Sequence, residues 1–201
     1  MTLHSLRRAA TNPTLRLVLL HGYGSDERDM YGLARELPPE IDVVCLRAPG
    51  ETENGGYAWF DISIDESGFG FDEEGFQMAV ALVLQELPSL RTEEVPFVVG
   101  GFSQGAMVAA AVTLIEPRVD AAWLMSGAFP PGLEMPASGS RPVFVQHGTM
   151  DPVLPVAMGR DLAKRLGEAG LQVESREYPM AHSISATSLE DGIEWLNGLV
   201  G

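Results

Sequence analysis

Residues 97–111 decide the fold, and they read Phe97-Val98-Val99-Gly100-Gly101-Phe102-Ser103-Gln104-Gly105-Ala106-Met107-Val108-Ala109-Ala110-Ala111. A buried-type apolar stretch leads into Gly-x-Ser-x-Gly, and a run of small residues with helical character follows. This is the context of a nucleophile elbow, a sharp strand-to-helix turn that exposes a serine hydroxyl. Glycines flank Ser103 because the turn leaves no room for side chains where strand and helix meet. We therefore expect a strained backbone at Ser103; the alternative is a purely structural turn.

Strand-like and helix-like segments alternate on both sides of this stretch. Strands are predicted at Leu15–Leu20, Ile41–Leu46, Phe97–Gly101, Ala121–Ser126, Pro142–His147 and Val173–Tyr178. Helices are predicted at Glu27–Glu36, Glu73–Leu87, Gln104–Ile115, Val156–Ala169 and Ser188–Leu199. Several strands are almost continuously apolar, which is typical of a mostly parallel sheet covered by helices on both faces. The predicted fold class is α/β.

Local signals mark some of the helix ends. Asp72 stands just before Glu73-Glu74, so we expect its side chain to cap a helix whose first turn is acidic. Pro38-Pro39, Pro88 and Pro117 follow three of the predicted helices and are interpreted as stop signals.

Composition narrows the class of protein and its partners. A chain of 201 residues with 45% apolar and 20% charged residues fits one domain over residues 1–201. Lys and Arg number 13 against 28 for Asp and Glu, and the net charge of −15 argues against a nucleic-acid partner. The apolar run Leu15–Leu20 is too short for a signal peptide or a spanning helix, so we expect no stable membrane insertion. The one cysteine, Cys45, excludes an internal disulfide and favours a buried thiol in a cytoplasmic protein.

One segment, at about residues 50–72, does not fit the alternation. It is rich in glycine and carries the aromatic residues Tyr57, Trp59, Phe60, Phe69 and Phe71. Long connections inside compact domains are often lids or binding loops, and the aromatic content argues against disorder. We expect an ordered, lid-like loop excursion; alternatively, the aromatic side chains only pack the excursion onto the sheet.

A serine hydroxyl needs a base, and in this fold the acid and then the histidine follow the serine along the chain. His147 and His182 are the histidines beyond Ser103. His182 comes just after the last predicted strand, and Asp151 lies in the loop beyond the strand that ends near His147. Carboxyl ends of strands are where active-site groups gather in α/β sheets. We therefore predict Ser103, Asp151 and His182 as a catalytic triad and His147 as structural, against ordinary loop roles for Asp151 and His182.

Acyl transfer also needs donors for the developing oxyanion. The backbone N–H of Gln104, directly after the nucleophile, is one candidate. The second is the backbone N–H of Tyr23, in a loop where Gly22 and Gly24 let the chain bend close to the serine. A plain glycine-rich turn is the alternative for this loop. His21, at its start, is expected to be a hydrogen-bonded scaffold residue rather than a base.

Together these motifs resemble the phospholipase/carboxylesterase family of α/β-hydrolases, which includes bacterial carboxylesterases and acyl-protein thioesterases. The resemblance runs from about Leu17 to Leu199 and is carried by Leu20-His21-Gly22-Tyr23-Gly24, Arg47-Ala48-Pro49, Asn54-Gly55-Gly56, Ala58-Trp59-Phe60-Asp61, Gly101-Phe102-Ser103-Gln104-Gly105, His147-Gly148-Thr149-Met150-Asp151-Pro152-Val153 and Tyr178-Pro179-Met180-Ala181-His182. It implies an α/β-hydrolase fold. It also implies the same triad and the same two oxyanion donors that the residue order predicts.

The predicted function is a serine carboxylesterase that cleaves small-molecule esters of short or medium acyl chains through an acyl-enzyme. Acyl-protein thioesterase or lysophospholipase-type activity is the alternative, followed by a peptidase and by a non-catalytic binding module on a hydrolase fold. Trp59, Leu154 and Met180 are candidates for the acyl pocket, with a core role as the alternative for each. We expect no cofactor and no metal, because the sequence has no His-x-x-x-His or cysteine pair with ligand spacing. Relatives include dimers, so a homodimer is a further expectation.

Overall fold

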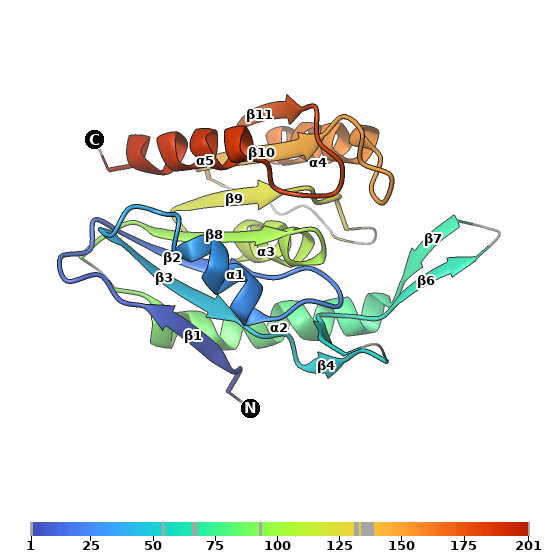
Figure 1. Cartoon of the computed structure of the whole chain (residues 1–201), viewed down its shortest axis with the longest axis horizontal. Coiled ribbons are helices and arrows are strands. Elements are labelled where there is room, and N and C mark those ends of the chain that lie inside the picture. Colours follow the sequence, from blue (N-terminus) through green and yellow to red (C-terminus); the bar gives the residue numbers. More distant parts are fainter. Residues whose placement is uncertain are drawn as a thin grey trace.

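A computed structural model of the chain describes residues 2–53, 55–65, 68–92, 94–130, 133 and 139–200, with only the backbone at 63–65, 68, 69 and 71. Its main feature is a seven-stranded sheet in the order β1-β3-β2-β8-β9-β10-β11. All neighbouring strands in it are parallel except β1, which runs antiparallel to β3. Figure 1 shows the strands stacked in this order from the N-terminal edge to the C-terminal edge. This is the mostly parallel sheet that the sequence predicts.

The seven strands of the main sheet are β1 (Ser5–Arg8), β2 (Leu15–Leu20), β3 (Ile41–Leu46), β8 (Phe97–Phe102), β9 (Ala121–Met125), β10 (Pro142–Gly148) and β11 (Gln172–Tyr178). The helices are α1 (Glu27–Ala34), α2 (Glu73–Leu90), α3 (Gln104–Ile115), α4 (Val156–Glu168) and α5 (Ala186–Gly198). Each of the eleven predicted elements has a counterpart whose ends differ by a few residues at most.

Helices cover both faces of the sheet, as predicted. One apolar cluster joins α1 and α5 to the sheet through residues such as Met30, Trp123 and Leu196. The other joins α2, α3 and α4 to the opposite face. In Figure 1, α1 lies in front of the sheet and α2 and α3 lie behind it. α3 is buried along almost its whole length, and its small residues let it approach β8 and β9 closely.

Two features differ from the sequence-based expectation. The edge strand β1 was not predicted, because Ser5-Leu6-Arg7-Arg8 has no apolar run; its arginines instead bond to the neighbouring chain, Arg7 to Asp42 and Arg8 to the carbonyl of Leu37. The interpretation of Pro88 as a stop signal was wrong, since α2 continues to Leu90. Proline removes a single backbone donor there, and it does so in the last turn, where little of the helix remains to be disturbed.

Several local expectations are confirmed. The side chain of Asp72 accepts a hydrogen bond from the N–H of Glu74 at the start of α2. Cys45 is a fully buried free thiol, and burial raises its pKa to about 12. Within the described residues, no helix is both long and apolar enough to span a membrane.

The excursion contains two small antiparallel sheets rather than irregular loop alone. β4 (Gly50–Glu51) pairs with β5 (Tyr57–Ala58), and β6 (Ile62–Asp65) pairs with β7 (Gly68–Phe71). Figure 1 shows β6 and β7 projecting away from the main sheet. Trp59 and Phe60 lie between β5 and β6 in the sequence, and both side chains are buried. This part of the excursion therefore packs onto the core. The predicted side-chain packing of Phe69 and Phe71, and the motif residue 54, lie outside what the structure describes.

Candidate active site

Ser103 stands at the junction of β8 and α3 with φ 54° and ψ −116°, a backbone conformation that side chains rarely adopt. The flanking glycines are required by space. A Cβ on Gly101 would lie 2.4 Å from the carbonyl carbon of Gly105, and one on Gly105 would lie 2.2 Å from the carbonyl oxygen of Leu20. The predicted strained turn is therefore present, and it holds the serine hydroxyl at the carboxyl end of the sheet.

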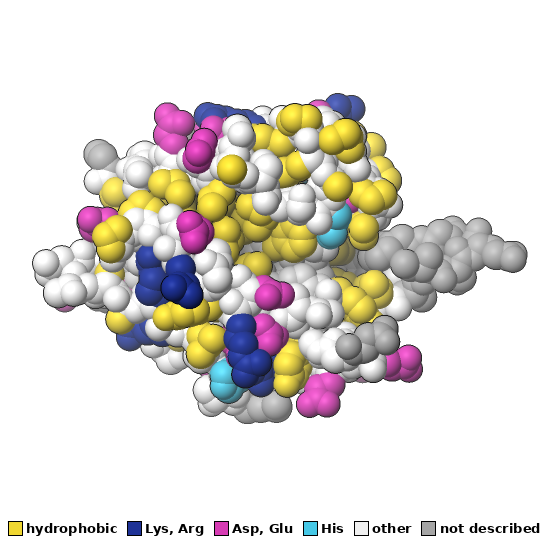
Figure 2. All heavy atoms as spheres, in the orientation of Figure 1, with side chains coloured by type: hydrophobic (Ala, Val, Ile, Leu, Met, Phe, Trp, Pro, Cys, Tyr) yellow, Lys and Arg dark blue, Asp and Glu magenta, His cyan; other side chains and the backbone are white. Residues whose placement is uncertain are grey.

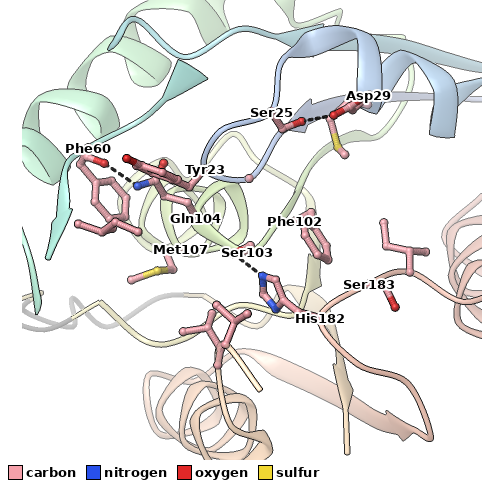
Figure 3. Close-up of a pocket in the computed structure, with 16 residues that line it drawn as sticks. Tyr23, Ser25, Asp29, Phe60, Phe102, Ser103, Gln104, Met107, His182 and Ser183 are labelled. Atoms are coloured by element: carbon pink, nitrogen blue, oxygen red, sulfur yellow. Dashed lines mark hydrogen bonds between the residues drawn. The ribbon is translucent and has the colours of Figure 1, made fainter. Parts of the chain in front are cut away.

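The side chains of Ser103, His182 and Asp151 form one chain of hydrogen bonds. Nε2 of His182 lies 2.8 Å from Oγ of Ser103, and Nδ1 of His182 lies 2.7 Å from Oδ2 of Asp151. Figure 3 shows the imidazole of His182 directed at Ser103. The ring of Phe102 packs against that imidazole with centroids 4.9 Å apart. The arrangement lets His182 accept a proton from the serine hydroxyl while the carboxylate orients its other nitrogen.

Asp151 is fixed by more than His182. Its Oδ1 accepts hydrogen bonds from the N–H groups of Val153 and Leu154, each at 2.9 Å. Its side chain is fully buried, and Nε2 of His147 approaches Oδ2 at 3.5 Å while bonding the carbonyl of Leu154 at 2.7 Å. His147 thus supports the loop that carries Asp151, which is the structural position expected for it. The two N–H bonds to Oδ1 fix the carboxylate so that Oδ2 faces Nδ1 of His182.

Backbone bonds tie the Asp151 loop to the His182 loop. The N–H of Thr149 donates to the carbonyl of Tyr178, and the N–H of Met150 donates to that of Met180. The close approach depends on Gly148, since a Cβ there would lie 2.3 Å from the carbonyl oxygen of Met180. These contacts explain how two residues 31 positions apart along the chain meet in a fixed geometry.

The loop after β2 lies beside the elbow, as the oxyanion prediction requires. A Cβ on Gly22 would lie 3.4 Å from Cβ of Ser103, so the backbone at this point passes next to the serine. Tyr23 and Gln104 both line the same cleft as Ser103. In the described part of the chain, the backbone N–H groups of these two residues donate to no protein acceptor. They remain available to a negatively charged oxygen that lies next to Oγ of Ser103.

His21 is a scaffold residue, as expected. Its Nδ1 bonds the carbonyl of Gly22 at 2.7 Å, and its Nε2 accepts from the N–H of Ala48 at 3.0 Å, which requires the neutral ring. Burial lowers the pKa of His21 below its ordinary value.

The side chain of Gln104 has a role that sequence reasoning missed. Its Oε1 accepts from the N–H of Trp59 at 2.8 Å, and its Nε2 donates to the carbonyl of Phe60 at 2.7 Å. The first helical residue of α3 therefore anchors the excursion to the nucleophile elbow. The sequence motif identifies Gln104 by its place after the serine. It does not indicate that the Gln104 side chain reaches a segment 45 residues away.

Ser103, His182, Tyr23 and Gln104 line a cleft of about 460 Å³. Its apolar lining residues are Met30, Phe60, Ile62, Phe102, Met107, Val153, Leu154 and Ile184. Figure 2 shows a hollow on this face that is bordered mainly by hydrophobic side chains. Concave, mostly apolar sites with a few convergent polar groups are typical of small-molecule binding.

Of the three residues predicted for the acyl pocket, one lines the cleft and two do not. Leu154 lines the cleft. Trp59 does not, because its indole is buried and donates to the carbonyl of His21 at 2.9 Å. Met180 does not either; it is buried, and its backbone is engaged by the Asp151 loop. For these two the core role fits the observed surroundings.

Other lining residues went unnoticed in the sequence, among them Ser25 and Asp29. They belong to the loop after β2 and the first turn of α1, and Ser25 Oγ donates to Oδ2 of Asp29 at 2.6 Å. Helical periodicity does not reveal which turn of a surface helix borders a cleft. Within the described residues, no group of three metal-ligating side chains is present.

Comparison with known proteins gives the family. A model of the phospholipase/carboxylesterase family matches residues 4–200. The chain belongs to this family. The resemblance noted in the sequence is thereby confirmed, and the chain is a hydrolase with the α/β-hydrolase fold.

Individual known proteins are similar to it over almost the whole chain. Acyl-protein thioesterase 1 of Saccharomyces cerevisiae is 31% identical, with 94% of this chain and 95% of the relative covered. The crystal structure of esterase PE8 superposes with a TM-score of 0.86 at 26% identity, covering 99% of this chain and 100% of that one. Acyl-protein thioesterase 2 of Zea mays, with a TM-score of 0.80, 22% identity and coverage of 98% and 99%, shares the fold.

Proposed function

We propose that this chain is a serine carboxylesterase that hydrolyses esters of short or medium acyl chains, with Ser103, His182 and Asp151 as its catalytic triad. The observation that carries the proposal is the position of His182, hydrogen-bonded to Ser103 at 2.8 Å and to Asp151 at 2.7 Å at the base of an apolar cleft. Nucleophile, base and orienting acid within hydrogen-bond reach are the signature of acyl transfer through a covalent intermediate.

The reaction follows from this geometry. As Oγ of Ser103 bonds to the ester carbonyl carbon, its proton passes to Nε2 of His182, and Asp151 stabilises the imidazolium. The N–H groups of Tyr23 and Gln104 bind the oxyanion. The bond to the leaving oxygen then breaks, and His182 returns the proton to that oxygen. Water, activated in the same way, splits the acyl-enzyme and regenerates the serine.

The apolar lining supports an alkyl acyl group. In Figure 3, Phe60 and Met107 lie on one side of Ser103, next to the segment that Gln104 anchors. The cleft volume, about 460 Å³, lies within the ~300–1,000 Å³ usual for small-molecule sites.

Thioester hydrolysis is the second candidate function. It is favoured by the 31% identity to the yeast acyl-protein thioesterase. A triad and oxyanion donors treat an ester and a thioester alike until the leaving group departs, so the same residues serve both reactions.

The first experiment tests for an activated serine without assuming a substrate. The protein is incubated with a fluorophosphonate probe, and its intact mass is measured beside the Ser103→Ala variant. One adduct on the wild type and none on the variant is the expected result. A folded wild type without an adduct would overturn the proposal and favour a non-catalytic module.

The second experiment separates the two candidate functions. Turnover is compared on p-nitrophenyl esters of two to sixteen carbons and on the N-acetylcysteamine thioesters of the same acids. Highest kcat/KM on the shorter esters supports the carboxylesterase. A preference for long-chain thioesters supports the thioesterase.

Three expectations remain proposals beside these: a single-domain organisation, a cytoplasmic location and a homodimer. The buried, unpaired thiol of Cys45 supports the second. Size-exclusion chromatography with light scattering tests the third.

A further inference from the structure

The cleft carries one carboxylate that the proposed chemistry does not use, that of Asp29. The other titratable side chains that line it are those of Tyr23 and His182, and within the described residues no lysine or arginine lines it. Asp29 is therefore the one acidic residue among the described residues that line the cleft.

The charge of Asp29 is not neutralised by its neighbours. Two nearby acids have cationic partners: Glu27 is paired with Arg47 at 2.6 Å, and Asp26 lies 3.6 Å from Arg28. Among the described residues, no ion pair includes Asp29. The N-terminus of α1 supplies the equivalent of about half a positive charge, which leaves a net negative charge at this end of the cleft.

A hydroxyl group sets the orientation of this carboxylate. Ser25 Oγ donates to Oδ2 of Asp29 at 2.6 Å, and both residues line the cleft. Among the described residues none hydrogen-bonds to Oδ1 of Asp29, which can therefore meet a ligand. Figure 3 shows Ser25 and Asp29 joined across the loop and the first turn of α1, away from Phe60 and Met107.

The position of Asp29 corresponds to the leaving group rather than to the acyl chain. His182 must hand its proton to the leaving oxygen, so the leaving group lies on the side of the serine where His182 stands. In Figure 3, Phe102 and Ser183 lie on that side and Asp29 lies above Phe102, whereas the apolar pair Phe60 and Met107 lies on the opposite side of Ser103. The two sides of the cleft thus differ in charge.

We propose that Asp29 is a specificity-determining residue that selects leaving groups carrying a positive charge, so that the preferred substrates are esters of alcohols that bear an ammonium group. This inference rests on the proposed esterase function and names the substrate class for it. The net charge of −15 on the whole chain acts in the same direction, because it raises the local concentration of cationic substrates. Leaving groups with a carboxylate or phosphate are repelled.

The test uses two esters of nearly identical shape. Butyrylcholine and 3,3-dimethylbutyl butyrate differ in a quaternary nitrogen against a quaternary carbon, so their ratio of kcat/KM reports the effect of charge. We expect Asp29→Asn to lower this ratio roughly two- to fivefold at low ionic strength, the range measured for exposed ion pairs. Glu36→Gln is the matched control: Glu36 is exposed beyond the far end of α1, its loss changes the net charge equally, and the ratio is expected to stay that of the wild type.

A salt titration of the wild type provides a test that needs no variant. The ratio is expected to fall as NaCl rises from 20 mM to 500 mM, because salt screens charges at a cleft open to solvent. An equal ratio in Asp29→Asn and wild type, or a ratio independent of salt, would overturn the inference. Turnover of p-nitrophenyl butyrate without turnover of either alkyl ester would overturn it too. Absence of both p-nitrophenyl turnover and a fluorophosphonate adduct is a different result, since it refutes the esterase proposal itself and the inference with it.

Discussion

The side-chain amide of Gln104 holds the backbone of Trp59, with Oε1 of Gln104 2.8 Å from the N–H of Trp59. Gln104 also follows the nucleophile directly, so one residue joins the elbow to the excursion that covers part of the cleft. Its other amide atom bonds the carbonyl of Phe60, a residue that lines the cleft. The shape of the proposed acyl side therefore depends on a side chain whose backbone N–H is a proposed oxyanion donor.

Replacing Gln104 by leucine separates these two roles. Gln104→Leu keeps the backbone N–H but removes the acceptor of the buried Trp59 N–H and the amide that donates to the carbonyl of Phe60, so we expect a loss of about 2 kcal/mol in the free energy of unfolding. KM for p-nitrophenyl butyrate and hexanoate should rise while fluorophosphonate labelling of Ser103 persists. Urea unfolding and steady-state kinetics check both effects. Gln172→Leu is the control: it removes an exposed hydrogen bond to Ser140, and unchanged stability is expected. Equal stabilities for the two variants would contradict the anchoring role.

Replacing Asp151 by asparagine tests the orienting acid. The amide oxygen of the Asp151→Asn variant can still accept from Val153 and Leu154, which directs the NH₂ group at His182. His182 must then carry its proton on Nε2, where it cannot accept one from Ser103. We expect kcat to fall about 10³- to 10⁴-fold with little change in unfolding temperature. Asp161→Asn, at an exposed site on α4, should leave kcat unchanged. Near-normal kcat in Asp151→Asn would remove Asp151 from the triad.

Much of this site was predictable because its residues follow rules that a linear sequence displays. The glycines on either side of Ser103 indicate a nucleophile elbow in the sequence. Asp151 and His182 each follow a strand whose carboxyl end reaches the same edge of the sheet. The structure brings all three side chains into hydrogen-bond contact. The buried parallel strands were likewise predictable, because their sequences are almost continuously apolar.

The remaining features depend on contacts that periodicity does not encode. β1 is a polar edge strand held by ion pairs and carbonyl contacts of its arginines, so it has no hydrophobic signature. Trp59 and Met180 belong to motifs beside the site, yet their side chains are buried outside the cleft, while Asp29 borders it from a helix turn. Sequence position indicates which loop a side chain comes from, but its direction is decided by packing.

Replacing glycine by alanine is expected to lower stability at Gly105 and to raise it at Gly167. At Gly105 an added methyl group would meet the backbone of Leu20 and His21, at 2.2 Å from one oxygen and 2.6 Å from the other. Overpacking against backbone costs about 1–3 kcal/mol or more, so Gly105→Ala should lower stability and slow fluorophosphonate labelling. At Gly167, in α4, an added Cβ meets nothing within 4 Å, and Gly167→Ala should stabilise by about 0.5 kcal/mol through helix propensity. Thermal and urea unfolding measure both, and a stable, fully active Gly105→Ala would refute the close packing of the elbow.

The buried imidazole of His21 makes stability depend on pH. Burial lowers its pKa below 6.5, outweighing the hydrogen bond to Gly22 and the charges of Asp26, Glu27 and Asp29, which raise it. Below pH 6.5 the unfolded chain therefore binds a proton that the folded chain does not, and the free energy of unfolding falls as pH falls toward the folded-state pKa. The limiting slope from one such group is about 1.4 kcal/mol per pH unit.

Urea unfolding between pH 7 and pH 5 tests this dependence. We expect a steeper loss of stability in the wild type than in His21→Asn. His4→Asn, which removes a half-exposed ring near the N-terminus, should keep the steep dependence. Parallel pH profiles for the wild type and His21→Asn would mean that the ring accepts a proton in the folded protein, which its hydrogen bond from Ala48 does not allow.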